Sequence, residues 1–243
     1  MFRPSQERFA ELAAQGNLVP IVREIMADLD TPLSIFKRLD DGRTSFLLES
    51  VEGGEKWARY SFIGTGSRAV FRARGREIEW TRGGRTERLT AEGDPLEFLR
   101  ARLAAYRPAW PEELELPRFV GGAVGLIGYD WVRFVERIPD TNPDRIGLPD
   151  LWFGFPETVV VYDNVRHKAL IVRLAEIAEG ADPSAVYAAE CRAIEAVVAR
   201  LREALPGEKP AEPIRVPMDV DRSMTESGYH EIVKRAKEYI EAG

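Results

Sequence analysis

Two short stretches of the chain carry side chains that together can bind a free amino acid. The first ends in Leu48, Glu49 and Ser50, and the second begins at Arg59. A free amino acid needs an acceptor for its ammonium group, donors for its carboxylate and an apolar slot for its side chain. Glu49, the hydroxyl and neighbouring amides of Ser50, and Leu47 or Leu48 can supply these groups. The pattern predicts an effector pocket, with Ser50 as its first candidate residue.

An ordinary structural explanation of these residues stays open. Leucines followed by polar residues are also typical of a core strand that reaches the surface, and such strand ends are common. Arg59 has two explanations as well. It can pair with Glu49 and fix the wall of the pocket, or it can be a solvated charge that adds little stability. If the pair forms, replacing either residue should weaken effector binding without unfolding the domain.

We find no catalytic constellation in the sequence. Cys191 lies on the apolar stripe of a predicted helix with no histidine nearby in the sequence, which favours an inert buried thiol. His167 and His230 have no second histidine or cysteine at metal-ligand spacing, so no metal site is predicted in this chain.

The glycine-rich stretches favour structural roles. Aromatic and β-favouring residues flank the glycines of residues 121–128, which is unlike a dinucleotide fingerprint. We expect these glycines to allow close backbone approach in a bent strand. Residues 64–67 are expected to form a tight turn between strands and not an anion site, because no helix follows them.

Composition limits the classes of function. The 243 residues suffice for one large domain or two small ones, and a single cysteine excludes an internal disulfide. No run approaches the ~20 apolar residues that cross a bilayer, and no secretory signal is visible, so a cytoplasmic protein without membrane contact is expected. The net charge of −6 and the scattered basic residues argue against nucleic-acid binding.

The elements that must position these residues are mostly strands. A hairpin is expected from two strands that flank a turn at Asp41 and Gly42, and alternation with turn residues predicts further antiparallel strands. The predicted strands cover residues 33–39, 44–50, 68–74, 76–80, 85–89, 158–162 and 169–177.

Helices are expected where apolar residues recur at helical spacing. They cover residues 5–14, a segment that opens at Asp94 and Pro95, and one that opens at Asp182 and Pro183. Residues 1–205 are then a first domain and residues 206–217 a proline-rich linker. Residues 218–243 begin a second domain with an amphipathic helix whose capping box starts at Ser223. Because that apolar face has little sequence left to receive it, we expect the chain to be truncated.

Several motifs resemble anthranilate synthase component I. They are Leu47-Leu48-Glu49-Ser50, Arg59-Tyr60-Ser61, the segments 17–20, 27–32 and 119–125, and the residues Tyr129, Asp130, Val132, Arg133 and Glu136. The resemblance runs nearly from end to end of the chain. It departs at Leu126, where the family commonly has tyrosine, which leaves the exact role of that stretch open.

The resemblance implies a fold and a function. The fold implied is α+β, with antiparallel sheets packed in a sandwich and helices outside, which the expected element order permits. The enzyme implied is a magnesium-dependent lyase that converts chorismate and ammonia to anthranilate and pyruvate in tryptophan biosynthesis. Its ammonia comes from a glutamine amidotransferase subunit. The resemblance places the chorismate and magnesium ligands in a carboxy-terminal half that this sequence lacks, so this part alone is expected to be inactive.

The resemblance also implies that this part binds L-tryptophan as a feedback inhibitor, through Leu48, Glu49, Ser50 and Arg59. Three alternatives stay open. Aminodeoxychorismate synthase component I has a similar amino-terminal half, and product identity separates the two enzymes. A stand-alone amino-acid-binding module without catalysis is consistent with the missing acid–base cluster. An interaction domain that binds no small molecule is the third.

Overall fold

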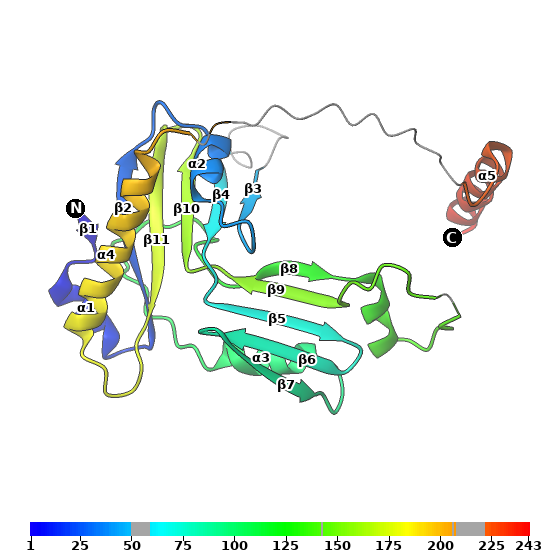
Figure 1. Ribbon diagram of the computed structural model, residues 1–243, viewed down its shortest axis with the longest axis horizontal. Coiled ribbons are helices and arrows are strands. Elements are labelled where there is room, and N and C mark those ends of the chain that lie inside the picture. Colours follow the sequence, from blue (N-terminus) through cyan, green and yellow to red (C-terminus); the bar gives the residue numbers. More distant parts are fainter. Residues whose placement is uncertain (50–58, 142, 206, 208–221) are drawn as a thin grey trace. The chain divides into compact units, whose positions relative to one another are not determined.

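A computed structural model describes residues 1–49, 59–141, 143–205, 207 and 222–243. Two compact units make up the chain: Met1–Pro206 and Gly207–Gly243. The first unit holds two antiparallel sheets and four α-helices, and the second holds one helix (Figure 1). The predicted α+β fold with two antiparallel sheets and outer helices is therefore confirmed.

The larger sheet carries the strands that flank the predicted pocket. Its strand order is β1-β2-β11-β10-β4-β3, and every neighbouring pair is antiparallel. The strands are β1 (Phe2–Arg3), β2 (Leu18–Met26), β3 (Phe46–Leu48), β4 (Tyr60–Thr65), β10 (Thr158–Asp163) and β11 (Lys168–Glu176). The predicted pairing of β10 with β11 is confirmed, and β3 is the edge strand beside β4.

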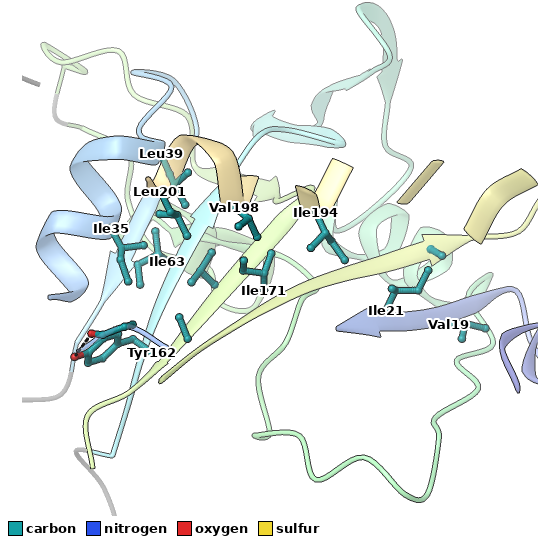
Figure 2. Close-up of a cluster of buried hydrophobic side chains, with 14 of the residues drawn as sticks. Val19, Ile21, Ile35, Leu39, Ile63, Tyr162, Ile171, Ile194, Val198 and Leu201 are labelled. Atoms are coloured by element: carbon teal, nitrogen blue, oxygen red, sulfur yellow. Dashed lines mark hydrogen bonds between the residues drawn. The ribbon is translucent and has the colours of Figure 1, made fainter. Parts of the chain in front are cut away.

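Three helices cover one face of this sheet: α1 (Gln6–Ala13), α2 (Pro32–Leu39) and α4 (Pro183–Leu201). In Figure 2, Ile194, Val198 and Leu201 of α4 lie close to the sheet residues in a cluster of fully or nearly buried side chains. Ser5 caps α1, and Asp182 caps α4, which opens where the sequence predicts. This layer holds the main hydrophobic core.

The predicted strand at residues 33–39 is wrong, because these residues form helix α2. The side chain of Thr31 accepts a hydrogen bond from the Ser34 amide, the Ser34 hydroxyl accepts one from the Thr31 amide, and Pro32 occupies the first turn. Ile35 and Leu39 then lie on one buried helical face. The predicted hairpin is replaced by a helix, a turn capped by Asp41, and the short strand β3.

The smaller sheet has the order β7-β6-β5-β9-β8. Its strands are β5 (Ala69–Arg74), β6 (Glu77–Arg82), β7 (Arg85–Thr90), β8 (Val124–Ile127) and β9 (Leu151–Phe155). Helix α3 (Leu96–Ala104) contributes Leu99 to its buried cluster, which also contains Phe71 and Trp80. The strands expected between residues 68 and 89, and the helix that follows Asp94, are confirmed within a few residues.

Two continuous pairs of strands join the sheets. Strand β4 of the larger sheet leads through a turn at Gly66 into β5 of the smaller sheet, and β9 of the smaller sheet leads into β10 of the larger one. Because β4 pairs with β10 and β5 pairs with β9, both strands of each pair continue into the other sheet. Gly66 has φ +73°, which favours glycine, and the chain bends there. The predicted tight turn at residues 64–67 is wrong in its first half, because Gly64 and Thr65 still belong to β4. Among the described residues, no buried cluster contains strands of both sheets.

The face of the larger sheet opposite the helices has a cover of its own. Leu114 and Val120, from the segment before β8, are buried against Val159, Val161 and other valines of the sheet. Phe119 and Phe62 are partly buried against the same cluster. This face also carries the side chains at the ends of β3 and β4.

The glycine-rich segment contributes the edge strand β8 of the smaller sheet, followed by the 3-10 helix η1 (Tyr129–Phe134). A Cβ atom on Gly125 would lie 1.8 Å from the backbone oxygen of Trp152 in β9. The predicted close approach of the backbone is therefore confirmed at this glycine.

The second unit contains α5 (Glu226–Ala242), whose N-cap is Thr225 and not Ser223 as predicted. Its apolar residues Tyr229, Ile232, Tyr239 and Ile240 are exposed within the described residues. None of the helices described is long and apolar enough to cross a membrane.

Candidate functional site

The ends of β3 and β4 meet, as the pocket prediction requires. Leu48, the last residue of β3, pairs with Phe62 of the antiparallel β4. The last residue of β3, which precedes Glu49, and the first residue of β4, which follows Arg59, therefore lie at the same end of the strand pair. Ser50, the first candidate for effector binding, lies outside the described residues.

Leu48 and Glu49 are accessible to a ligand. The Leu48 side chain is on the face of the sheet shared by its partner Phe62, because paired residues point the same way, and Leu48 is 44% exposed. Glu49 is exposed as well. Leu47, one residue earlier, instead packs against the helix-covered core. Leu48 is thus the leucine that can offer an apolar surface.

An aromatic row extends from these strand ends across the same face. The row comprises Tyr60, Phe62, Phe119 and Phe46, and every member is partly buried. The ring centroids are 6.4 Å apart for Tyr60 and Phe62, 5.4 Å for Phe62 and Phe119, and 6.3 Å for Phe119 and Phe46. Phe62 and Phe119 meet edge to face, at 87°. Such rings can receive another aromatic ring by edge-to-face or offset contact.

Arg59 is paired, but its partner is Asp163 and not Glu49. Both Nε and Nη2 of Arg59 donate to Oδ2 of Asp163, at 3.1 and 2.7 Å. The guanidinium also lies 4.8 Å from the centroid of the Tyr60 ring. The two explanations given by the sequence, a Glu49 pair or an unpaired solvated charge, are both replaced by this long-range pair.

Asp163 is the buried residue of this site that sequence reasoning missed. It is 6% exposed, and its Oδ1 accepts hydrogen bonds from the amides of Val165 and Arg166. Burial raises the pKa of Asp163, but hydrogen bonds from Arg59 and from the two amides outweigh it, so that the pKa lies below its ordinary value. The carboxylate is therefore held in its charged form.

Asn164 ties the same strand ends together. Its backbone amide donates to the carbonyl of Arg59 at 2.8 Å, and its side-chain amide donates to the Ser61 hydroxyl at 3.1 Å. The sequence assigns the pair Asp163-Asn164 only to a turn between strands. The sequence signal for a further role is the residue type, because aspartate and asparagine side chains can form hydrogen bonds with the backbone of a turn.

A second aspartate fixes the approach to β3. Oδ1 of Asp41 accepts hydrogen bonds from the amides of Arg43, Thr44 and Ser45, at 2.8, 3.0 and 3.3 Å. Burial raises the pKa of Asp41, but these bonds outweigh it and lower the pKa to about 2. These hydrogen bonds hold together the turn that leads into β3.

A separate cavity of about 910 Å³ lies at the end of the smaller sheet distant from Gly66. Several of its charged residues are engaged: Arg74 pairs with Asp144, and Arg133 donates to Asp130 at 3.0 Å and to the carbonyl of Pro139 at 2.8 Å. Leu48, Glu49 and Arg59 do not line it. These contacts of Arg74 and Arg133 hold the surrounding loop together.

Metal ligands do not gather in the part of the chain that the structure describes. Groups of three or more histidine, cysteine, aspartate or glutamate residues suited to a metal ion are not found there. Cys191 is half-buried, and burial raises the pKa of its thiol, which makes it a poor nucleophile.

Comparison with known proteins gives consistent relatives. Residues 44–243 match the family described as chorismate binding enzyme. Anthranilate synthase component 1 of Pseudomonas aeruginosa is 41% identical over 98% of this chain and 49% of that protein. The protein of the same name from Synechocystis sp. is 35% identical over 100% of this chain and 49% of that protein.

A solved structure agrees on the fold. The crystal structure of anthranilate synthase component I from Streptococcus pneumoniae aligns with a TM-score of 0.52 and 22% identity, over 90% of this chain and 45% of that one. The chain thus spans about half the length of the curated relatives that it matches.

Proposed function

Because this chain belongs to the family of chorismate binding enzymes, we propose that it is the amino-terminal half of an anthranilate synthase component I and that this half binds L-tryptophan as a feedback inhibitor. The observation that carries the proposal is the meeting of the β3 and β4 ends beside an aromatic row. The 41% identity of this chain to about half of an anthranilate synthase component 1 supports the proposed assignment to that enzyme.

The side chains that the structure describes can contact the ammonium group and the indole of tryptophan. Glu49 is exposed and can accept hydrogen bonds from the ammonium group. Leu48 and the rings of Phe62 and Phe119 offer an apolar and aromatic surface to the indole. Ser50 is proposed to bind the carboxylate, because its hydroxyl and the neighbouring amides are hydrogen-bond donors. Because the charge of Arg59 is engaged by Asp163, Arg59 is proposed to shape the wall of the site.

The catalytic half is proposed to lie outside this chain. A protein of the relatives' length is proposed to convert chorismate and ammonia into anthranilate and pyruvate, with ammonia supplied by a glutamine amidotransferase subunit. Magnesium, which would stabilise negative charge on chorismate, is assigned to that other half, since the described residues do not form its site. Chain 1–243 alone is proposed to be inactive. A cytoplasmic location is part of the proposal.

Inhibition is proposed to follow from a preference of tryptophan for one of two conformations of the intact protein. A ligand shifts such an equilibrium only if its affinity differs between the two states. By linkage, chorismate must then weaken tryptophan binding by the same factor by which tryptophan weakens chorismate binding.

The test is to purify the intact protein and to identify the product formed from chorismate, magnesium and ammonium. The expected result is anthranilate, with formation suppressed by L-tryptophan and not by L-leucine. Aminodeoxychorismate as the product would assign the rival enzyme. No product, together with tryptophan binding, would indicate a stand-alone sensor. Neither product nor binding of any amino acid would leave an interaction domain.

A further inference from the structure

Asp163 is a buried charge whose position the motif resemblance does not explain. It ends β10, and 8% of its side chain is exposed. One carboxylate oxygen accepts two backbone amides of the following turn, and the other accepts both donors from Arg59. The carboxylate thus joins the turn after β10 to the start of β4.

Arg59, the arginine that Asp163 binds, is in turn packed over an aromatic ring. Two bonds to one carboxylate oxygen restrict the planar guanidinium, and its 4.8 Å distance from the Tyr60 centroid places it over that ring. Tyr60 neighbours Phe62, which contacts Phe119 edge to face. A displacement of Arg59 would release Tyr60 at one end of the aromatic row.

We propose that Asp163 is a positioning residue of the effector site, which holds Arg59 over Tyr60 and thereby fixes the aromatic row that receives the indole of tryptophan. This inference rests on the proposed function. Asp163 itself does not contact the ligand. It acts because a preformed aromatic surface costs less to order on binding than one that must be assembled.

A purely structural role would have a different signature. If Asp163 only capped the turn after β10, its replacement would change folding stability. Any effect of that replacement on tryptophan affinity would then be the same whether or not Arg59 is present. If it acts through Arg59, the effects of the two residues on tryptophan affinity are coupled, and removing one makes the other ineffective.

The experiment is a double-mutant cycle on the intact protein with Asp163→Asn, Arg59→Gln and the double variant, with L-tryptophan affinity measured by titration calorimetry. Asparagine keeps an oxygen for the Val165 and Arg166 amides but removes the charge that holds Arg59. Each single change is expected to weaken binding about tenfold, and the double change no further, because both break one link. Glu190→Gln is the control, since it breaks a similarly buried pair with Arg173 on the helix-covered side.

Wild-type affinity in Asp163→Asn would overturn the inference while the proposed function stands. A full tenfold loss from Asp163→Asn in the Arg59→Gln background would also overturn it. If Asp163→Asn does not fold, Arg59→Gln alone decides, because its side chain is one-third exposed and wild-type affinity there excludes the link. Absence of tryptophan binding in the unaltered protein would instead refute the proposed function.

Discussion

At the scale of single residues, the side chain of Leu48 is the most direct probe of the site. It is 44% exposed and shares a sheet face with Phe62, so a ligand, and not the protein core, would complete its surroundings.

The change Leu48→Asp should weaken L-tryptophan binding by at least about tenfold, because an ionised group would face the indole. The free energy of unfolding should change by no more than about 0.5 kcal/mol, since the position is accessible to water. Titration calorimetry and denaturant unfolding measure the two quantities.

Leu29→Asp is the matched control, because Leu29 is 99% exposed and belongs to neither β3 nor β4. It should leave the affinity unaltered. Equal losses of affinity in both variants would show that Leu48 is not part of the site.

The sequence indicates these residues unevenly. Leu48, Glu49 and Arg59 belong to short motifs that can be recognised in the sequence. Asp163 lies 104 positions from Arg59, and only the register of β4 against β10 brings the two together. Local patterns carry no information about that register, which is why an Asp-Asn pair was interpreted as a turn alone.

At the scale of elements, β3 depends on a close fit against β4. Gly64 pairs with Phe46, and a Cβ atom on Gly64 would lie 2.0 Å from the Phe46 ring. The ring of Phe46, which ends the aromatic row, thus occupies the space above a glycine. Any side chain at position 64 must displace it.

Gly64→Ala should therefore lower the free energy of unfolding by about 1–3 kcal/mol through overpacking and should also weaken tryptophan binding. Gly93→Ala is the control, because a Cβ atom there meets no atom within 4 Å. In a Phe46→Ala background, Gly64→Ala should cost much less. An undiminished cost in that background would show that Phe46 is not the clashing group.

Helix α2 shows what element prediction missed. Alternating apolar and polar residues at 33–35 suggested a strand, but Thr31 and Pro32 supply a cap and a first turn, and Ile35 and Leu39 repeat at helical spacing. The strands of the smaller sheet were predictable because glycine turns separate regular alternations. The pairing of β3 with β4 was predictable as a meeting of strand ends, whereas its register was not.

At the scale of the molecule, a polar cluster links the two sheets of the first unit. Oε1 of Glu176, in β11, accepts hydrogen bonds from Arg68 and from the Tyr106 hydroxyl, both at 2.8 Å, and Arg82 of β6 pairs with its other oxygen. This network is a polar contact between the two sheets, in addition to the continuous strands.

Glu176→Gln should lower the free energy of unfolding at neutral pH by about 1–3 kcal/mol, because it weakens several charge-assisted hydrogen bonds. Burial raises the pKa of Glu176, but Arg68, Tyr106 and Arg82 outweigh it and lower the pKa below the ordinary 4.5. A lowered pKa stabilises the fold above the ordinary value, and this stabilisation is lost as the pH falls through the lowered pKa.

The difference in stability between the unaltered protein and Glu176→Gln should thus be largest near pH 7 and shrink below pH 4.5. Thermal unfolding across this pH range measures it. Glu113→Gln, which breaks an exposed pair with Arg8, should show little difference at any pH. A difference for Glu176→Gln that is constant with pH would contradict the role of its charge.

The function that we propose for this chain is to bind L-tryptophan for an enzyme that acts on chorismate. It is tested most directly by titrating L-tryptophan into the intact protein with and without saturating chorismate. We expect measurable binding to the free protein and a several-fold weaker affinity when chorismate is present, as the proposed function requires. An affinity that chorismate does not change, or no tryptophan binding under either condition, would contradict it.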